Sequence, residues 1–481
     1  MIEYEPVIGL EVHAELLTRS KMFCSCAVVD STEAEPNRYV CPVCTAQPGV
    51  LPVINRQAVE YAMMVGLALN CTINEFNQFA RKSYFYPDLP KGYQISQYEH
   101  PLASNGWLEI EVGDSTRRIG IRRAHLEEDT GKLFHVGDHS LVDLNRAGVP
   151  LLEIVSEPDM RSVEEVEAYA RKLRAILVYL GVNHGDMSKG VLRFEANISI
   201  RPRGSEELNT RTEIKNLNSI RSLVRATRYE IQRQIEVVES GGQVVQQTMG
   251  FDEDTGRTQA QRGKEQAHDY RYFPEPDLPP LHISREWVAE IGERLPELPD
   301  ARRERFIQEF GLSLQDAVVL VADKAVADYY EAALAAGGDP KIVANWVTGE
   351  LFRLMNTAGL EIGGIRVAPE ALVELIALVE AGKINNNTAK EVLEIMFETG
   401  RGAEEIVEER GLAQISDSSA LEVLVERVIA ENPQQVQKYL GGKEGLLGWF
   451  VGQVMRETKG QANAQMVNEM FRKRLEALRE G

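Results

Sequence analysis

Residues 8–16 constrain the fold more than any other stretch, because their side chains alternate strictly between apolar and polar. That period of two is the period of a β-strand, so one face of the strand belongs to a hydrophobic core. The other face carries Glu11, His13 and Glu15. Two carboxylates that flank an imidazole form either a solvated polar face or the oxygen and nitrogen ligands of a divalent cation.

Further carboxylates occupy strand-like segments later in the chain. Residues 191–200 alternate in the same way and carry Glu195 on their polar face. Glu153 is the only charge in the apolar run 149–155, where a carboxylate is costly unless it is paired or bound to a metal. Four more potential ligands lie within five residues, namely His125, Glu127, Glu128 and Asp129. These segments supply candidate ligands for a metal centre.

The order of elements predicts an α+β protein. At 481 residues the chain is too long for one hydrophobic core and should form about three domains. Hairpin patterns alternate with a few long helices, expected at 56–68, 163–180 and 219–239, which is typical of a domain built on an antiparallel sheet. From about residue 299 the pattern is helical. The expected domains are 1–293, 294–405 and 406–481.

Four cysteines form two close pairs. Cys24 and Cys26 are separated by one residue, and Cys41 and Cys44 follow after a gap of fourteen residues. Two thiol pairs at this spacing predict a structural zinc knuckle, in which four thiolates close a tetrahedral site. The alternative is a set of reduced free thiols, because disulfides are not expected in a cytosolic chain.

Residues 81–97 predict a long polar loop. Two prolines and a glycine prevent a regular element through the middle, and long loops of this kind are often functional. Its candidate functional residue is Lys91, which lies beside Gly92 and is suited to contact an anion. The alternative is a surface loop held in place by its tyrosines.

Composition excludes several classes of protein. The net charge of -20 argues against a surface that binds nucleic acid throughout, although the last fifty residues carry eight basic and five acidic side chains. The chain contains no P-loop, no G-x-G-x-x-G after a strand, no H-E-x-x-H and no G-x-S-x-G. It has no apolar run of transmembrane length and no signal peptide pattern, so we expect a cytoplasmic protein without a membrane partner.

Several longer motifs resemble the B subunit of the bacterial tRNA-dependent amidotransferase. The likeness spans essentially the whole chain and rests on the runs at residues 7–13, 84–88, 93–97, 127–129, 141–146, 153–159 and 269–277. That family amidates Glu-tRNA(Gln) or Asp-tRNA(Asn) for protein biosynthesis. The resemblance implies a cradle domain akin to glutamine synthetase, then a helical domain and a small helical tail that binds tRNA.

The resemblance also implies a set of site residues and partners. The magnesium and ATP-activation site would fall on Glu11, His13, Glu128, Glu153 and Glu195, although many members have Asp where this chain has Glu195. The four cysteines match those members that keep the zinc knuckle. Ammonia would come from a separate glutaminase of the amidase type, with a further small protein completing a heterotrimer, and Lys82 and Lys91 would line its route. Basic residues of the tail, Lys459 and 472–474, would contact tRNA phosphates.

Two other classes are compatible with part of the sequence. A non-catalytic zinc-knuckle RNA-binding protein would account for the cysteines and the basic tail but not for the carboxylates. A two-metal hydrolase would account for the carboxylates but not for the helical tail. ATP turnover that requires aminoacylated tRNA separates the three classes.

Overall fold

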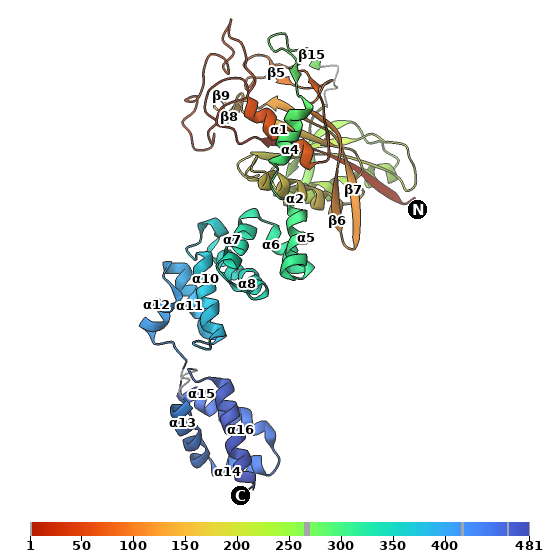
Figure 1. Cartoon of the computed structure of the whole chain (residues 1–481). Coiled ribbons are helices and arrows are strands. Elements are labelled where there is room, and N and C mark those ends of the chain that lie inside the picture. The colour runs from red at the N-terminus through yellow and green to blue at the C-terminus, as the bar shows by residue number, and fades with distance from the viewer. Residues whose placement is uncertain (1, 264–269, 415–417, 459–460, 481) are drawn as a thin grey trace. The chain divides into compact units, whose positions relative to one another are not determined.

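The computed structural model describes residues 2–263, 270–414, 418–458 and 461–480. The chain forms two compact units, Met1–Pro299 and Asp300–Gly481 (Figure 1). The first unit combines a large sheet with helices, and the second contains only helices among its described residues. This is the α+β organisation expected from the sequence.

A nine-stranded sheet forms the body of the first unit. Its strand order is β14-β13-β12-β11-β1-β10-β7-β6-β2. The strands are β1 (Tyr4–Glu15), β2 (Thr72–Ile73), β6 (Ala103–Val112), β7 (Ser115–Glu128), β10 (Pro150–Ser156), β11 (Leu192–Pro202), β12 (Thr212–Leu217), β13 (Gln247–Asp252) and β14 (Arg257–Gly263). Neighbouring strands are antiparallel except β12 and β13, which run parallel, so the sheet is mixed rather than purely antiparallel as expected.

The alternation in β1 decides which face of the sheet is buried. Leu10, Val12 and Ala14 are fully buried in the hydrophobic core, as their spacing predicts. Helices α1 (Arg56–Ala68), α2 (Val163–Tyr179) and α3 (Ile220–Glu239) pack against strands of this sheet and contribute to the same core. Each begins at a side-chain cap, Asn55, Ser162 or Ser219, as helix starts commonly do. The polar side chains of β1 are left on the opposite face.

A smaller sheet replaces part of the predicted loop at 81–97. Strands β4 (Ala80–Ser83) and β5 (Tyr93–Ser96) pair antiparallel, and β15 (Phe273–Pro274) adds to β4. Only residues 84–92 between them are irregular, where the prolines and the glycine lie. Strands β8 (Lys132–Val136) and β9 (His139–Asp143) form a hairpin. Strand β3 (Phe76–Asn77) pairs with β16 (Leu281–His282), which lies far from it in the sequence. Helix α4 (Arg285–Glu293) packs on α1.

The second unit has two separate hydrophobic cores. The first lies between residues 306 and 407, and the second between residues 421 and 475. The α-helices are α5 (Pro299–Phe310), α6 (Leu314–Val321), α7 (Lys324–Ala335), α8 (Pro340–Trp346), α9 (Phe352–Ala358), α10 (Pro369–Glu380), α11 (Asn386–Thr399), α12 (Ala403–Arg410), α13 (Ser418–Glu431), α14 (Pro433–Leu440), α15 (Leu447–Glu457) and α16 (Ala464–Glu480). None of the helices in the described ranges is long and apolar enough to span a membrane. The domain boundaries at 293 and 405 stay a prediction.

Candidate functional site

Strand register brings the polar residues of four segments onto one face of the large sheet. His13 lies opposite Glu153 of β10 on one side, and Glu11 lies opposite Glu195 of β11 on the other. Glu153 in turn lies opposite His125 of β7. Because directly paired residues of neighbouring strands point to the same face, these side chains share one surface.

Two overlapping groups of ligand atoms result, and we call them together the His13 cluster. One consists of Glu11, His13 and Glu195, and the other of His13, Glu127 and Glu153; within each group the ligand atoms lie within 4.8 Å of one another. His13 Nδ1 is 3.3 Å from Glu127 Oε1, and His13 Nε2 is 3.9 Å from Glu195 Oε1. The imidazole therefore lies between carboxylates from two other strands.

Glu128 does not join this cluster, and its neighbour Glu127 takes the expected place. The Glu128 carboxylate accepts a hydrogen bond from the Ile95 backbone N–H at 3.0 Å and pairs with Lys91 Nζ at 2.6 Å. The alternation along β7 explains the difference. Leu126 is buried in the core, so His125 and Glu127 share the polar face and Glu128 does not. The same alternation could have identified Glu127 from the sequence.

Burial and charge shift the protonation of the His13 cluster. Burial works against the charged imidazole, but the hydrogen bond to Glu127 and the nearby Glu153 and Glu195 carboxylates raise the pKa of His13 to about 9. Burial raises the pKa of Glu153, and the charge on Glu127 raises it further. Carboxylates held this close repel one another, so another cation among them would be stabilised.

Two lysines and an asparagine lie near the His13 cluster, and of these the sequence had predicted a functional role only for Lys82. Lys215 Nζ lies 3.1 Å from Glu195 Oε2, and Asn197 Nδ2 donates to Glu11 Oε1 at 2.8 Å. Burial opposes the charge on Lys82, whereas Tyr272 and the carboxylates of Glu127 and Glu153 raise its pKa above the ordinary value. Lys82 thus belongs to the electrostatic environment of the His13 cluster, while Lys91 pairs with Glu128.

Two cavities lie near these residues. A cavity of about 140 Å³ is lined by Glu11 and Asn197 together with Arg122, Ser199 and Arg211. Arg122 is partly neutralised by Glu157 at 2.6 Å. A second cavity, of about 220 Å³, is lined by residues that include Lys91, Glu128, Lys21, Cys24 and Cys44. The first cavity adjoins the His13 cluster, and the second extends from the Lys91–Glu128 pair to the cysteines.

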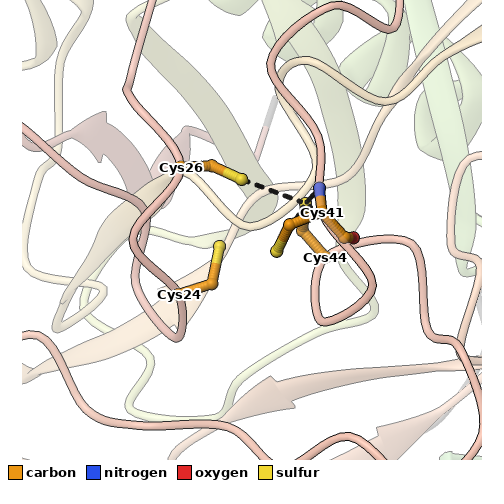
Figure 2. Close-up of side chains that lie close together, drawn as sticks. All are labelled: Cys24, Cys26, Cys41 and Cys44. Carbon is orange, nitrogen blue, oxygen red and sulfur yellow. Dashed lines mark hydrogen bonds between the residues drawn. The ribbon is translucent and has the colours of Figure 1, made fainter.

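The four paired cysteines converge as their spacing predicts. Figure 2 shows their side chains turned toward a common centre, and the four sulfur atoms lie within 4.8 Å of one another. Cys44 Sγ is 4.0 Å from Cys26 Sγ and 3.9 Å from Cys41 Sγ, and it accepts a hydrogen bond from the Cys41 backbone N–H. These donors match a tetrathiolate metal site.

A buried lysine supports this group. Lys21 is fully buried, and its Nζ lies 3.6 Å from Cys44 Sγ and 3.2 Å from the Leu144 carbonyl oxygen. A hydrogen bond from Cys24 lowers the pKa of Cys44 to about 4 despite burial, and the Cys41 backbone N–H and the Lys21 charge act in the same direction. The structure therefore favours a thiolate at Cys44, the form that binds a metal.

Comparison with known proteins identifies the family. The model of the GatB/GatE catalytic domain matches residues 6–289, and the model of the GatB domain matches residues 328–475. The chain belongs to the GatB family of tRNA amidotransferase B subunits. Curated relatives, each named as the B subunit of an aspartyl/glutamyl-tRNA(Asn/Gln) amidotransferase, match it over nearly the full length of both chains.

The similarity to individual GatB proteins is high. The relative from Moorella thermoacetica is 55% identical over 98% of this chain and all of its own length. Those from Thermodesulfovibrio yellowstonii and Carboxydothermus hydrogenoformans are 54% and 53% identical, over 98% and 99% of this chain and 99% and 100% of their own lengths. The chain is therefore a component of an amidotransferase that acts on aminoacyl-tRNA, as the motif resemblance implied.

Proposed function

We propose that this chain activates the side-chain carboxylate of Glu-tRNA(Gln), Asp-tRNA(Asn) or both with ATP and then joins it to ammonia. A carboxylate oxygen attacks the γ-phosphorus and ADP leaves. Ammonia then attacks the acyl carbon and phosphate leaves, which yields the amide. The observation that carries this proposal is the His13 cluster, a partly buried set of carboxylates around an imidazole in a chain of the GatB family.

Magnesium fits the His13 cluster. Carboxylate oxygens are its preferred protein ligands. Burial and then repulsion by Glu127 raise the pKa of Glu153, and a cation would relieve that repulsion. The proposed ligands are Glu11, His13, Glu127, Glu153 and Glu195, and His13 would have to lose its proton to bind the metal. When bound, magnesium would neutralise charge on the phosphates. His13 and Lys215 hold Glu127 and Glu195 in place on the sheet.

The cavity of about 140 Å³ is the proposed position of the ATP phosphates. It adjoins Glu11 and presents the guanidinium groups of Arg122 and Arg211, which suit phosphate oxygens. Asn197 and Ser199 add hydrogen-bonding groups to the same wall. Lys82, close to Glu127 and Glu153, would oppose the negative charge that gathers where phosphate and carboxylate meet.

Ammonia is proposed to come from a separate amidase-type glutaminase, in a heterotrimer that a further small protein completes. The proposed polar route passes the cavity of about 220 Å³ beside the Lys91–Glu128 pair. Zinc is proposed to bind Cys24, Cys26, Cys41 and Cys44 and to stabilise the wall of this cavity, since Cys24 and Cys44 line it. With four thiolates bound, zinc would be structural.

The large sheet is proposed to form a cradle like that of glutamine synthetase. The helical tail is proposed to bind tRNA. Residues 472–474 are basic and lie on α16, and Arg474 contacts Glu426 at 2.5 Å. Lys459, the other basic residue expected to contribute, lies outside the described residues. An enzyme of this kind would act in the cytoplasm, where aminoacyl-tRNA is made and used.

An amidation assay tests the proposed function. The purified chain with its partner subunits is given ATP, free ammonia and either Glu-tRNA(Gln) or Asp-tRNA(Asn), and the amino acid released from the tRNA is identified. Conversion to glutamine or asparagine that requires ATP supports the proposal. Hydrolysis of ATP without amidation would favour a hydrolase, and RNA binding without ATP turnover would favour a non-catalytic RNA-binding protein.

A further inference from the structure

Aromatic rings gather around the small sheet formed by β15, β4 and β5. Tyr98 and Tyr272 are stacked, with ring centroids 4.2 Å apart and planes inclined by 8°. Tyr270 meets Tyr272 edge-on at 6.1 Å. Phe85 and Phe273 are exposed, Phe85 to 80%. We call these five residues the aromatic surface.

Cations are interleaved with the aromatic surface. Lys82 Nζ lies 5.0 Å from the ring centre of Tyr270, and Arg123 Cζ lies 5.6 Å from that of Tyr98. Arg271 Cζ lies 6.0 Å from the ring of Phe85. In a chain with a net charge of -20, this combination of two exposed rings, three half-buried tyrosines and neighbouring cations is suited to an anionic ligand that also has flat apolar faces.

The aromatic surface adjoins the His13 cluster through two residues. Lys82 is close to Tyr270 and is also influenced by the charges of Glu127 and Glu153. Arg123, beside Tyr98, lies on the same face of β7 as His125 and Glu127. It is four residues from Glu127, a separation of about 13 Å along a strand.

That separation is of the same order as the dimensions of an acylated RNA end. In aminoacyl-tRNA the side-chain carboxylate is joined through the amino acid and the ribose to the last base, a distance of roughly 10 Å by summed covalent geometry. With the carboxylate at the His13 cluster, the base would reach the aromatic surface. Single-stranded RNA ends are commonly bound by stacking on aromatic side chains with cations near the phosphates.

We propose that the aromatic surface stacks the 3′-terminal base of the acylated tRNA and so positions its amino acid at the His13 cluster. This inference rests on the proposed function, because it requires an acylated tRNA as substrate. Tyr272 and Phe85 are positioning residues here, and Lys82, Arg123 and Arg271 contribute charge.

Fluorescence of a labelled tRNA end tests this inference. The full chain with its partner subunits is titrated against tRNA carrying 2-aminopurine in place of the terminal adenine, and total binding is followed separately on a filter. Stacking quenches 2-aminopurine, so its fluorescence falls on binding to the wild-type protein. The quenching is lost in Phe85→Ala and Tyr272→Leu and kept in Tyr272→Phe. The KM for aminoacyl-tRNA rises about tenfold in the first two variants, the effect of losing one stacked base.

A matched variant controls for general effects of removing an aromatic ring. Phe134→Ala removes a partly exposed ring from β8, outside the aromatic surface, and leaves the quenching and the KM unchanged. Phe85 is so exposed that its loss does not threaten folding, which circular dichroism checks. The wild-type protein could bind and amidate the tRNA while Phe85→Ala and Tyr272→Leu leave both the quenching and the KM unchanged. In that case the inference is wrong and the proposed function stands. If the wild-type protein neither binds nor amidates tRNA, both fail.

Discussion

Glu127 and Glu128 are adjacent carboxylates with different proposed roles, the first in the activation site and the second on the ammonia route. They therefore offer a matched test of the His13 cluster. Both are almost fully buried. Glu127 lies 3.3 Å from His13 Nδ1, whereas Glu128 pairs with Lys91 and accepts the Ile95 N–H. Glutamine in place of either residue keeps the shape of the side chain and removes one negative charge.

The magnitude expected for Glu127→Gln follows from the electrostatics of the cluster. Two unit charges 4 Å apart interact by about 4 kcal/mol at an effective dielectric constant of about 20. The glutamine amide oxygen retains part of that interaction, and losing one preorganised electrostatic contact typically slows a reaction by about 10²- to 10³-fold. We therefore expect activation to slow by about 10²-fold or more. The protein should stay folded, because the glutamine amide oxygen can still accept the hydrogen bond from His13 and the substitution reduces repulsion with Glu153.

The assay is single-turnover amidation of aminoacyl-tRNA with free ammonia, which bypasses the glutaminase. Glu127→Gln should be slow under these conditions, and Glu128→Gln should be close to wild type. With glutamine as the nitrogen source, Glu128→Gln should lose activity because the Lys91–Glu128 pair lies on the proposed ammonia route. A wild-type rate from Glu127→Gln with free ammonia would refute the assignment of this residue to the activation site.

Three other predictions concern the rest of the chain. Lys21→Met removes the cation beside Cys44, so a chelator should remove zinc about 10- to 100-fold faster than from the wild type. An equal rate of zinc loss, or a wild-type protein without zinc, would contradict the proposed zinc site. Glu230→Ala removes the buried carboxylate that accepts hydrogen bonds from Thr212, Gln234 and Thr258. The free energy of unfolding measured in urea should fall by about 3 kcal/mol. A fall below about 1 kcal/mol would show that this hydrogen-bond network contributes little to stability. Deleting residues 415–481 should weaken tRNA binding and flatten its salt dependence while glutamine hydrolysis continues, and unchanged affinity would exclude the tail from the tRNA site.

Local patterns in the sequence predicted much of the first unit. The alternation at residues 8–16 predicted a strand with a buried and a polar face, and β1 has both. The helix expected at 163–180 is observed as Val163–Tyr179. The cysteine spacing predicted a converging group, because four thiols in two short segments leave few other arrangements.

Local sequence patterns could not predict the features that depend on pairing between segments distant in the chain. The parallel pairing of β12 with β13 and the approach of Lys215 to Glu195 are set by how distant strands align. The burial of Lys21 beside Cys44 depends on the path of two loops. The placing of Glu128 in the site has another origin. Motif resemblance alone does not distinguish two consecutive glutamates, whereas the alternation of side chains along β7 identifies Glu127 as the one on the polar face.

Transfer of a labelled oxygen tests most directly whether the side-chain carboxylate is activated by phosphorylation. Glu-tRNA(Gln) or Asp-tRNA(Asn) carrying ¹⁸O in the side-chain carboxylate is amidated with ATP and free ammonia, and the released phosphate is analysed by mass spectrometry. Phosphorylation of the carboxylate followed by displacement with ammonia transfers one carboxylate oxygen to each phosphate, so phosphate bearing a single ¹⁸O is expected. Amidation that releases phosphate without ¹⁸O would contradict this account of the activation site.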